Sequence, residues 1–302
     1  MALVDKVTRA FDLMTRNRDR RLNPPPRGSR KPPRPAGAQR KPRPAMEENP
    51  VRSARPDKGH ARRDSDVTRV YGFHSVAAAL KAPRRELIRL YATPAAAERL
   101  SAEIAARAVE TRIMSGEEIA ARAPRGAVHQ GVLLEARPLA PIDIADLPAK
   151  GLALVLDQIT DPQNVGAILR TGAAFAVDAL VTTERHSPEF SGALAKTASG
   201  GLEHVPICSV TNLARALAEM GDMGYWRIGL DAEAPVSLVD AALSRPLALV
   251  LGAESKGIRR LTRERCDSLA RLDLPGAITS LNVSNACAIA LALVHDRSRS
   301  DT

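Results

Sequence analysis

The sequence predicts an α/β protein with two α/β domains behind a basic N-terminal tail. From Gly151 onward, short and almost wholly apolar runs recur between helical stretches, which is typical of parallel strands covered on both faces. Between Val70 and Leu139, shorter β-like runs alternate with helical ones. The first 66 residues contain 10 of the 22 prolines and one aromatic residue, and cannot supply a core.

The whole net charge of +10 belongs to residues 1–66. This segment has 18 Lys and Arg against 8 Asp and Glu, whereas residues 67–302 have 26 of each. We therefore expect a disordered basic tail. It could neutralise the phosphates of a nucleic acid, or it could merely keep the chain soluble.

The first domain is predicted at residues 67–138, followed by a linker at 139–150. Strands are expected at 87–92, 111–114 and 131–135, and helices at 76–81 and 95–108. Pro138, Pro141 and Pro148 should break any regular element in the linker.

The second domain is predicted at residues 151–302, with a sheet at its centre. Its strands are expected at 152–156, 179–182, 205–210, 226–230 and 247–251. Asn212 and Leu213 should open a helix, and an apolar helix should end near His295. The domain is therefore expected to be α/β.

Several classes of protein are disfavoured by composition. The three cysteines are odd in number and widely spaced, without a C-x-x-C pair, so we expect no metal and a reducing, cytoplasmic setting. No apolar run reaches 18 residues, so no membrane association is expected.

The first segment that could carry chemistry runs from Asp157 to Thr171. An apolar strand ends at Asp157, and Asn164 is expected to cap the helix that follows. Arg170 lies six residues further on. Taken alone, the two residues could be an ordinary cap and an outward-facing charge.

The second segment runs from Ala248 to Ile258, where a buried strand enters a loop with two glycines and one carboxylate. Gly252 and Glu254 are at the carboxyl end of that strand, where ligands bind in open parallel sheets. The glycine spacing is that of a P-loop, but Ile258 and Arg259 stand where Lys and Ser or Thr should follow. ATP hydrolysis is therefore disfavoured.

The third segment runs from Arg271 to Asn285 and leads into the apolar helix. Ser280, Asn282 and Ser284 are all good cap residues, so they could simply cap that helix redundantly. Together with Gly276 they could also hold a small polar ligand at the helix N-terminus.

Taken together, the three segments resemble one family. The order N-V-G-x-x-x-R, L-G-x-E-x-x-G and S-L-N-V-S is similar to the three motifs of the SpoU class of SPOUT RNA ribose 2′-O-methyltransferases. The resemblance spans roughly residues 70–296. Tyr71-Gly72 and His129-Gln130-Gly131-Val132 resemble the ends of the family's L30e-like substrate-binding domain.

The resemblance implies a fold, a cofactor and a partner. It implies an L30e-like domain followed by a SPOUT parallel-sheet domain with a C-terminal trefoil knot, and a homodimer. It also implies S-adenosyl-L-methionine as cofactor, bound against the residues that match the family's cofactor loops, Gly252, Leu272, Leu274 and Leu281.

The implied catalytic residues are Asn164, Arg170, Glu254, Ser280 and Asn282. The family often assigns proton removal to the motif-one arginine, but a guanidinium is a poor base. We expect Arg170 to hold phosphate or ribose oxygens while Glu254 orients it, with Asn282 and Ser280 positioning the 2′-hydroxyl.

One position departs from the family, and the substrate stays open among related RNAs. Where I-P-M is common before the last motif, the chain has Leu272-Asp273-Leu274, so Asp273 could alter the cofactor loop or point to solvent. The resemblance to family members with an L30e-like domain implies structured 23S rRNA as the substrate, with guanosine as the modified nucleotide. The alternatives are tRNA, a resistance-type rRNA methyltransferase, and a non-enzymatic RNA-binding or ribosome-assembly protein.

Overall fold

A computed structural model describes residues 67–300 except 186, 189 and 191. The basic tail at residues 1–66 lies outside the described residues. Within the described part of the chain, none of the helices combines the length and apolar character needed to span a bilayer.

The N-terminal part of the described chain holds a four-stranded mixed sheet. Its strand order is β1-β4-β2-β3, in which β4 runs antiparallel to both neighbours and β2 pairs in parallel with β3. The elements are β1 (Thr68–Tyr71), α2 (Phe73–Lys81), β2 (Leu87–Ala92), α3 (Pro94–Arg99), α4 (Ser101–Arg107), β3 (Thr111–Ile113), α5 (Gly116–Arg122) and β4 (Val132–Ala136).

The C-terminal part holds a seven-stranded sheet in which every pairing is parallel. The strand order is β7-β6-β5-β10-β8-β11-β9. After a short 3₁₀ helix, η1 (Ile144–Asp146), the elements are β5 (Leu152–Asp157), α6 (Pro162–Ala174), β6 (Ala179–Thr183), α7 (Gly192–Ala198), α8 (Gly201–His204), β7 (Ile207–Val210), α9 (Leu213–Asp222), β8 (Trp226–Leu230), β9 (Val236–Ser237), β10 (Leu247–Gly252), α10 (Arg260–Arg263), β11 (Ser268–Arg271) and α11 (Val283–Ser300).

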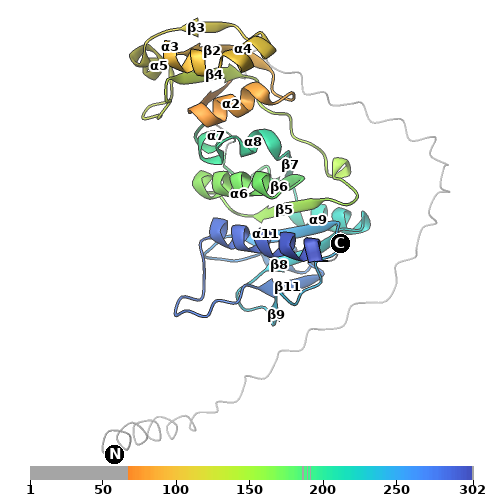
Figure 1. Cartoon of the computed structure of the whole chain (residues 1–302). Coiled ribbons are helices and arrows are strands. Elements are labelled where there is room, and N and C mark those ends of the chain that lie inside the picture. The colour runs from red at the N-terminus through yellow and green to blue at the C-terminus, as the bar shows by residue number, and fades with distance from the viewer. Residues whose placement is uncertain (1–66, 186, 189, 191, 301–302) are drawn as a thin grey trace, which may run out of the picture. The chain divides into compact units, whose positions relative to one another are not determined.

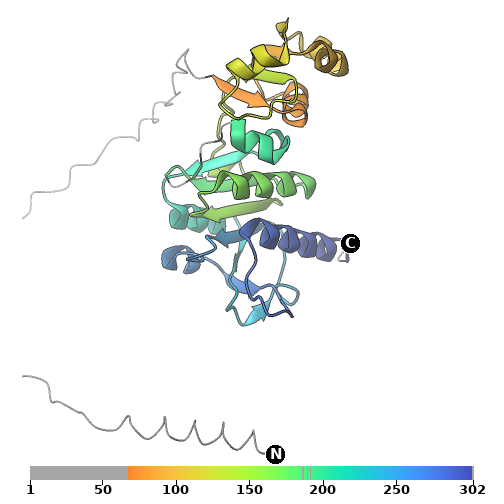
Figure 2. The ribbon, with the colours of Figure 1, turned by 90° about the vertical axis from the view of Figure 1, so that its left-hand side faces the viewer.

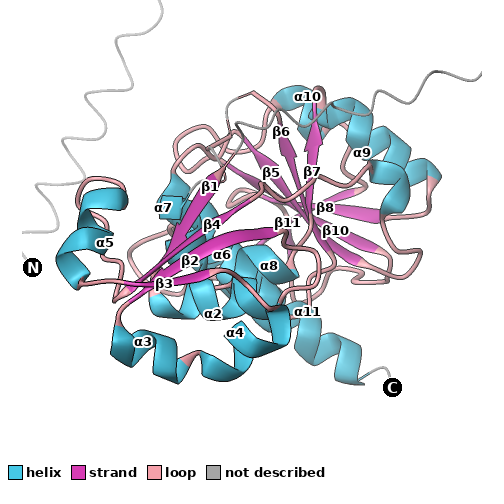
Figure 3. Ribbon diagram, turned by 90° about the horizontal axis from the view of Figure 1, so that it is seen from above, coloured by secondary structure: helices cyan, strands magenta, loops and turns pink. Residues whose placement is uncertain are grey.

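Alternate residues of the central strands point to opposite faces, and helices cover both. Leu152 and Leu154 of β5 pack in the apolar cluster that includes α6 and α11, whereas Ala153 and Val155 pack in the cluster that includes α9. Figure 3 shows α9 on the side of this sheet away from α6, α8 and α11. Burial on both faces explains why these strands are continuously apolar and confirms the predicted fold class.

The apolar cluster under α6 and α11 continues into the N-terminal sheet. Val76 and Leu80 of α2 belong to the same cluster of buried residues as Leu194 and Ala198 of α7. Figures 1 and 2 both show α2 next to α7. The two sheets are therefore joined by shared side-chain packing as well as by the chain between them.

Two predicted segments differ from the structure, and one helix was not predicted. The helix expected at 95–108 is two helices, α3 and α4, because Leu100 leaves helical geometry (φ −106°, ψ 11°). The expected linker at 139–150 contains η1, which is capped by Asp143 and buries Ile144 and Leu147. The capping box of Ser115 and Glu118 starts α5, a helix that hydrophobic periodicity did not indicate.

A charge-assisted contact closes the turn that leads into β11. Asp267 accepts hydrogen bonds from the backbone N–H of Arg227 (2.8 Å), from its Nε (2.8 Å) and from its Nη2 (2.6 Å). These bonds with Arg227 lower the pKa of Asp267. A carboxyl group whose folded pKa is depressed stabilises the fold above its unfolded pKa, and this contribution is lost as pH falls through the folded value.

We predict that Asp267→Asn lowers the free energy of unfolding by about 1–3 kcal/mol at pH 7, because it removes a charged acceptor of three hydrogen bonds. Urea denaturation at pH 7 and at about pH 3 would measure this, and the difference from wild type should shrink at the lower pH. The exposed Asp240→Asn is the matched control. An equal difference at both pH values would contradict the prediction.

Candidate functional site

The candidate site lies at the carboxyl edge of the seven-stranded sheet. There the parallel pairing of β5 and β10 sets Asp157 directly beside Gly252. Asp157 is fully buried and accepts hydrogen bonds from the backbone N–H (2.9 Å) and Nε (2.6 Å) of Arg259. This contact ties the end of the loop after β10 to the end of the neighbouring strand.

The loop after β10 is a tight turn that depends on two glycines. Gly257 adopts φ +63° and donates its N–H to the carbonyl of Ala253 at 2.7 Å. A Cβ on Gly252 would lie 2.1 Å from the carbonyl carbon of Gly257 and 2.4 Å from the nitrogen of Ile258. Gly252 therefore lets the two ends of the loop approach and places Glu254 on its tip.

Glu254 is the acceptor around which the three sequence motifs meet. Its Oε1 accepts hydrogen bonds from Asn282 Nδ2 (2.8 Å), from the backbone N–H of Val283 (3.2 Å) and from Asn164 Nδ2 (3.3 Å). Asn164 is 90 residues and Asn282 28 residues away in the chain. One residue from each motif therefore joins a single polar cluster, defined here as Asn164, Glu254 and Asn282.

Asn282 is held on both sides of its amide. Its Nδ2 also donates to Asn164 Oδ1 at 2.9 Å, and its Oδ1 accepts from the N–H (2.9 Å) and the hydroxyl (2.6 Å) of Ser284. The bond to the Ser284 N–H satisfies a free donor at the start of α11, as a helix cap does. Asn282 is thus both cap and cluster member, two roles that the sequence left as alternatives.

Two predictions about this cluster are wrong. Asn164 is not the N-cap of α6, because the helix begins at Pro162 and Asp161 caps it through the N–H of Gln163 (3.0 Å). Asn164 lies inside the first turn, and this frees its side chain for Glu254. Glu254 does not orient Arg170; it orients the two asparagines.

Arg170 lies away from the polar cluster on the same helix. It is six residues past Asn164, or about 9 Å along the helix axis. Its side chain is exposed and has no hydrogen-bond or ion-pair partner among the residues that the structure describes. The guanidinium is therefore available to an anion from outside this part of the chain.

A cavity of about 240 Å³ opens beside the polar cluster. Glu254 and Ser280 line it, so Ser280 is near the cluster without being bonded to it in the described structure. All the predicted cofactor-binding residues line this cavity: Gly252, Leu272, Leu274 and Leu281. The remaining lining comes mainly from the ends of β8 and β10 and the start of α11, including Asp231.

Asp273 departs from the family pattern and lies between Leu272 and Leu274, two residues that line the cavity. Its Oδ2 accepts the hydroxyl of the buried Ser237 at 2.5 Å, and its Oδ1 lies 3.1 Å from Arg271 Nε. The side chain is still 55% exposed. Asp273 thus fastens the segment between Leu272 and Leu274 to β9, and an effect on cofactor binding stays a prediction.

Sequence reasoning missed two contacts that support the site. The pair of Asp157 and Arg259 is one, and the hydrogen bond from Thr197 Oγ1 to Gln163 Oε1 (3.0 Å), next to Asn164, is the other. An apolar strand that ends in Asp was a usable signal for Asp157. Among the described residues no group of His, Cys, Asp and Glu could hold a metal ion.

The chain matches two family models. The model described as the SpoU rRNA Methylase family matches residues 151–292, and that described as RNA 2′-O ribose methyltransferase substrate binding matches residues 69–142. Among curated proteins, the 23S rRNA (guanosine-2′-O-)-methyltransferase RlmB of Yersinia pestis is 35% identical over 232 residues, which cover 74% of this chain and 94% of the relative.

Solved structures share the fold. One is a structure of a putative RNA methyltransferase of the TrmH family from Porphyromonas gingivalis, with a TM-score of 0.64, 26% identity, and coverage of 77% of this chain and 90% of that chain. Another is the SpoU methyltransferase AviRb from Streptomyces viridochromogenes in complex with the cofactor AdoMet, with a TM-score of 0.66, 19% identity, and coverage of 77% and 90%.

We predict that Gly252→Ala lowers the free energy of unfolding by about 1–3 kcal/mol, because the new methyl group must displace backbone atoms of the loop. Gly276→Ala is the matched control, since nothing lies within 4 Å of its added Cβ. That control should stay within about 0.5 kcal/mol of wild type. Chemical denaturation of both variants measures the difference, and equal stability would contradict the assigned packing.

Proposed function

The chain belongs to the SpoU family of RNA ribose 2′-O-methyltransferases, and we propose that it methylates a guanosine 2′-hydroxyl in 23S rRNA with S-adenosyl-L-methionine. Curated relatives named for this activity are about as long as the matched region: the match covers 94% of the Yersinia pestis protein and 88% of the one from Nitrosomonas europaea. The proposed substrate is taken from the names of these relatives, and the class of reaction follows from the family.

One observation about the site carries the proposal. The polar cluster of Asn164, Glu254 and Asn282 unites the three motifs at the side of a cavity that all the predicted cofactor-binding residues line. A methyl donor in the cavity would thus lie next to groups that can hold a hydroxyl. Methyl transfer requires such proximity, with the reacting atoms about 3–3.5 Å apart and in line.

The residues of the cavity fit S-adenosyl-L-methionine. Leu272, Leu274 and Leu281 supply apolar surface for an adenine ring, while Asp231 and Glu254 supply negative charge toward a cationic ligand. When bound, the cofactor supplies an activated methyl group. The protein has to bind it, orient the ribose and exclude water.

The roles of the cluster follow from which atoms are already bonded. Asn282 uses both of its amide atoms within the protein, so we assign it to holding Glu254 and the start of α11. Glu254 Oε2 has no hydrogen-bond partner among the described residues. We assign this oxygen to accepting the hydrogen bond that the ribose 2′-hydroxyl donates. Ser280, on the cavity wall, positions the same hydroxyl.

Arg170 is assigned to an RNA phosphate or ribose oxygen. A guanidinium binds such oxygens bidentately, and the exposed side chain of Arg170 has no partner among the described residues. We also propose, on the family resemblance, a homodimer with the site near the partner subunit and a trefoil knot in the C-terminal sheet. Because the proposed substrate is part of the ribosome, we also propose that the protein acts in the cytoplasm.

The direct test is ribose-methylation mapping of 23S rRNA and tRNA from cells with and without the gene, followed by addition of the purified full-length protein and labelled cofactor. Loss of one 2′-O-methylguanosine in 23S rRNA, restored by the protein, is the expected result. Restoration in tRNA would overturn the substrate. Unchanged sites and no cofactor binding would leave the RNA-binding alternative.

We predict that Glu254→Ala reduces kcat by about 10²-fold or more, because the variant loses both the hydroxyl acceptor and the anchor of the two asparagines. Glu219→Ala, an exposed carboxylate on α9, is the control and should keep full activity. Single-turnover methylation with saturating cofactor would measure both.

For Arg170→Ala we predict a loss of methylation with unchanged cofactor affinity, since this side chain does not line the cavity. Arg170→Lys should recover only part of the activity, because a lysine cannot bind two oxygens in a fork. Full turnover by Arg170→Ala would remove the residue from the site.

A further inference from the structure

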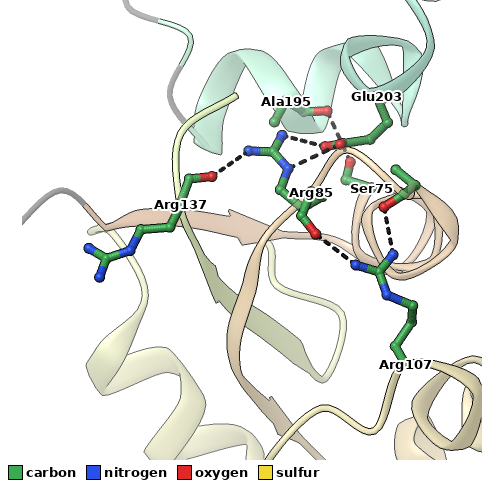
Figure 4. A network of polar contacts seen from close by, with 7 residues as sticks. Ser75, Arg85, Arg107, Arg137, Ala195 and Glu203 are labelled. Carbon is green, nitrogen blue, oxygen red and sulfur yellow. Dashed lines mark hydrogen bonds and ion pairs between the residues drawn. The ribbon is translucent and has the colours of Figure 1, made fainter. Parts of the chain in front are cut away.

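A buried ion pair outside the polar cluster joins the loop between α2 and β2 to helix α8. Arg85 lies between α2 and β2, and Glu203 is on α8, 118 residues later. Arg85 Nε lies 3.0 Å from Glu203 Oε2 and Arg85 Nη2 lies 2.5 Å from Glu203 Oε1 (Figure 4). The side chains are 1% and 2% exposed, so this bidentate contact is shielded from water and salt.

The surroundings of Arg85 fix its position tightly. Its Nη1 donates to the carbonyl of Arg137 (3.0 Å), and its own carbonyl accepts from Arg107 Nη2 (2.7 Å). Ser75 Oγ makes a second bond between the sheets, to the carbonyl of Ala195 (3.0 Å) (Figure 4). The backbones also approach closely, since a Cβ on Gly192 would lie 2.2 Å from the carbonyl oxygen of Arg69.

The helices that receive these contacts pack directly on α6. A Cβ on Gly201, the first residue of α8, would lie 2.6 Å from the carbonyl oxygen of Leu169 and 2.9 Å from Cα of Arg170. On α7, Thr197 donates to Gln163, the neighbour of Asn164. The elements that hold the N-terminal sheet therefore also support the helix that carries Asn164 and Arg170.

A buried ion pair contributes little to the free energy of unfolding, but it selects one relative orientation of the segments that it joins. Removing two charges from water costs several kcal/mol per ion, and an apolar pair of similar volume often stabilises a fold equally well. The bidentate geometry does fix an orientation, because both hydrogen bonds can form in only one relative orientation of the two segments that carry Arg85 and Glu203.

We propose that Arg85 and Glu203 are positioning residues that hold the substrate-binding region, residues 69–142, in one orientation on α7 and α8. RNA bound to that region is then presented to Arg170 and the polar cluster in one register. The role in catalysis rests on the proposed function, but the orientation itself does not.

The test uses the double variant Arg85→Met/Glu203→Met in the full-length chain, which removes both charges and keeps the volume. Arg260→Met/Glu264→Met is the matched control, because that pair has the same chemistry at 75% and 52% exposure. Spin labels at Glu117→Cys on α5 and Glu219→Cys on α9 report the distance between the two sheets. Cys208 and Cys287 are buried and react poorly with the label, and the partly buried Cys266 is replaced by serine in every labelled chain.

The expected result is a narrow distance distribution in wild type and control and a broad one in the double variant. KM for a 23S rRNA fragment should rise about ten-fold, or about 1.4 kcal/mol, while the Kd of S-adenosyl-L-methionine stays within about two-fold. A general loss of structure would lower cofactor affinity as well, so this split separates positioning from folding.

Other results overturn the proposal. An unchanged distance distribution would mean that apolar packing alone sets the orientation, and a broad distribution with unchanged KM would remove the role in catalysis. Loss of cofactor binding in the double variant would assign the pair to general stability. If the double variant does not fold, Glu203→Gln is judged by the same three measurements. If wild type methylates no RNA, the proposed function fails, and the distances still decide whether the pair sets the orientation.

Discussion

The parallel pairing of β5 with β10 is the constraint from which the site follows. Both strands are buried on both faces, so neither can shift by one residue without moving leucines from one apolar layer to the other. The fixed register sets Asp157 beside Gly252, and Asp157 then holds the loop after β10 through Arg259. Helix α6 follows β5 and the loop with Glu254 follows β10, so the same strand pairing brings Asn164 and Glu254 close together.

Much of the fold could be predicted because it depends on local patterns. The apolar runs of the parallel sheet, the helix opened by Asn212 and the glycine-flanked loop after β10 are all visible in short stretches of sequence. The small strands β9 and β11 and the helix α5 were missed, since each is short and only partly buried. Their placement depends on neighbours that a local pattern does not contain.

The residues of the candidate site were predicted from the sequence, but the hydrogen bonds between them were not. The three motifs pointed to Asn164, Glu254 and Asn282. Their spacing in the sequence could not show that Glu254 contacts the two asparagines and that Arg170 lies outside the cluster. The same holds for Arg85 and Glu203, because no spacing in the sequence indicates that these two residues meet. Their burial is a property of two segments that meet only in the fold.

The apolar cluster that runs from α2 to α11 also bears on how the protein folds. The cluster contains Val76 and Leu80 of α2 as well as Leu194 and Ala198 of α7, so a cut between β4 and β5 would divide it. Each half would then expose apolar surface that the intact chain hides, a condition that favours aggregation. Residues 67–300 should therefore gain and lose structure cooperatively, and exchange of the N-terminal sheet between relatives during evolution would require matched changes on α7 and α8.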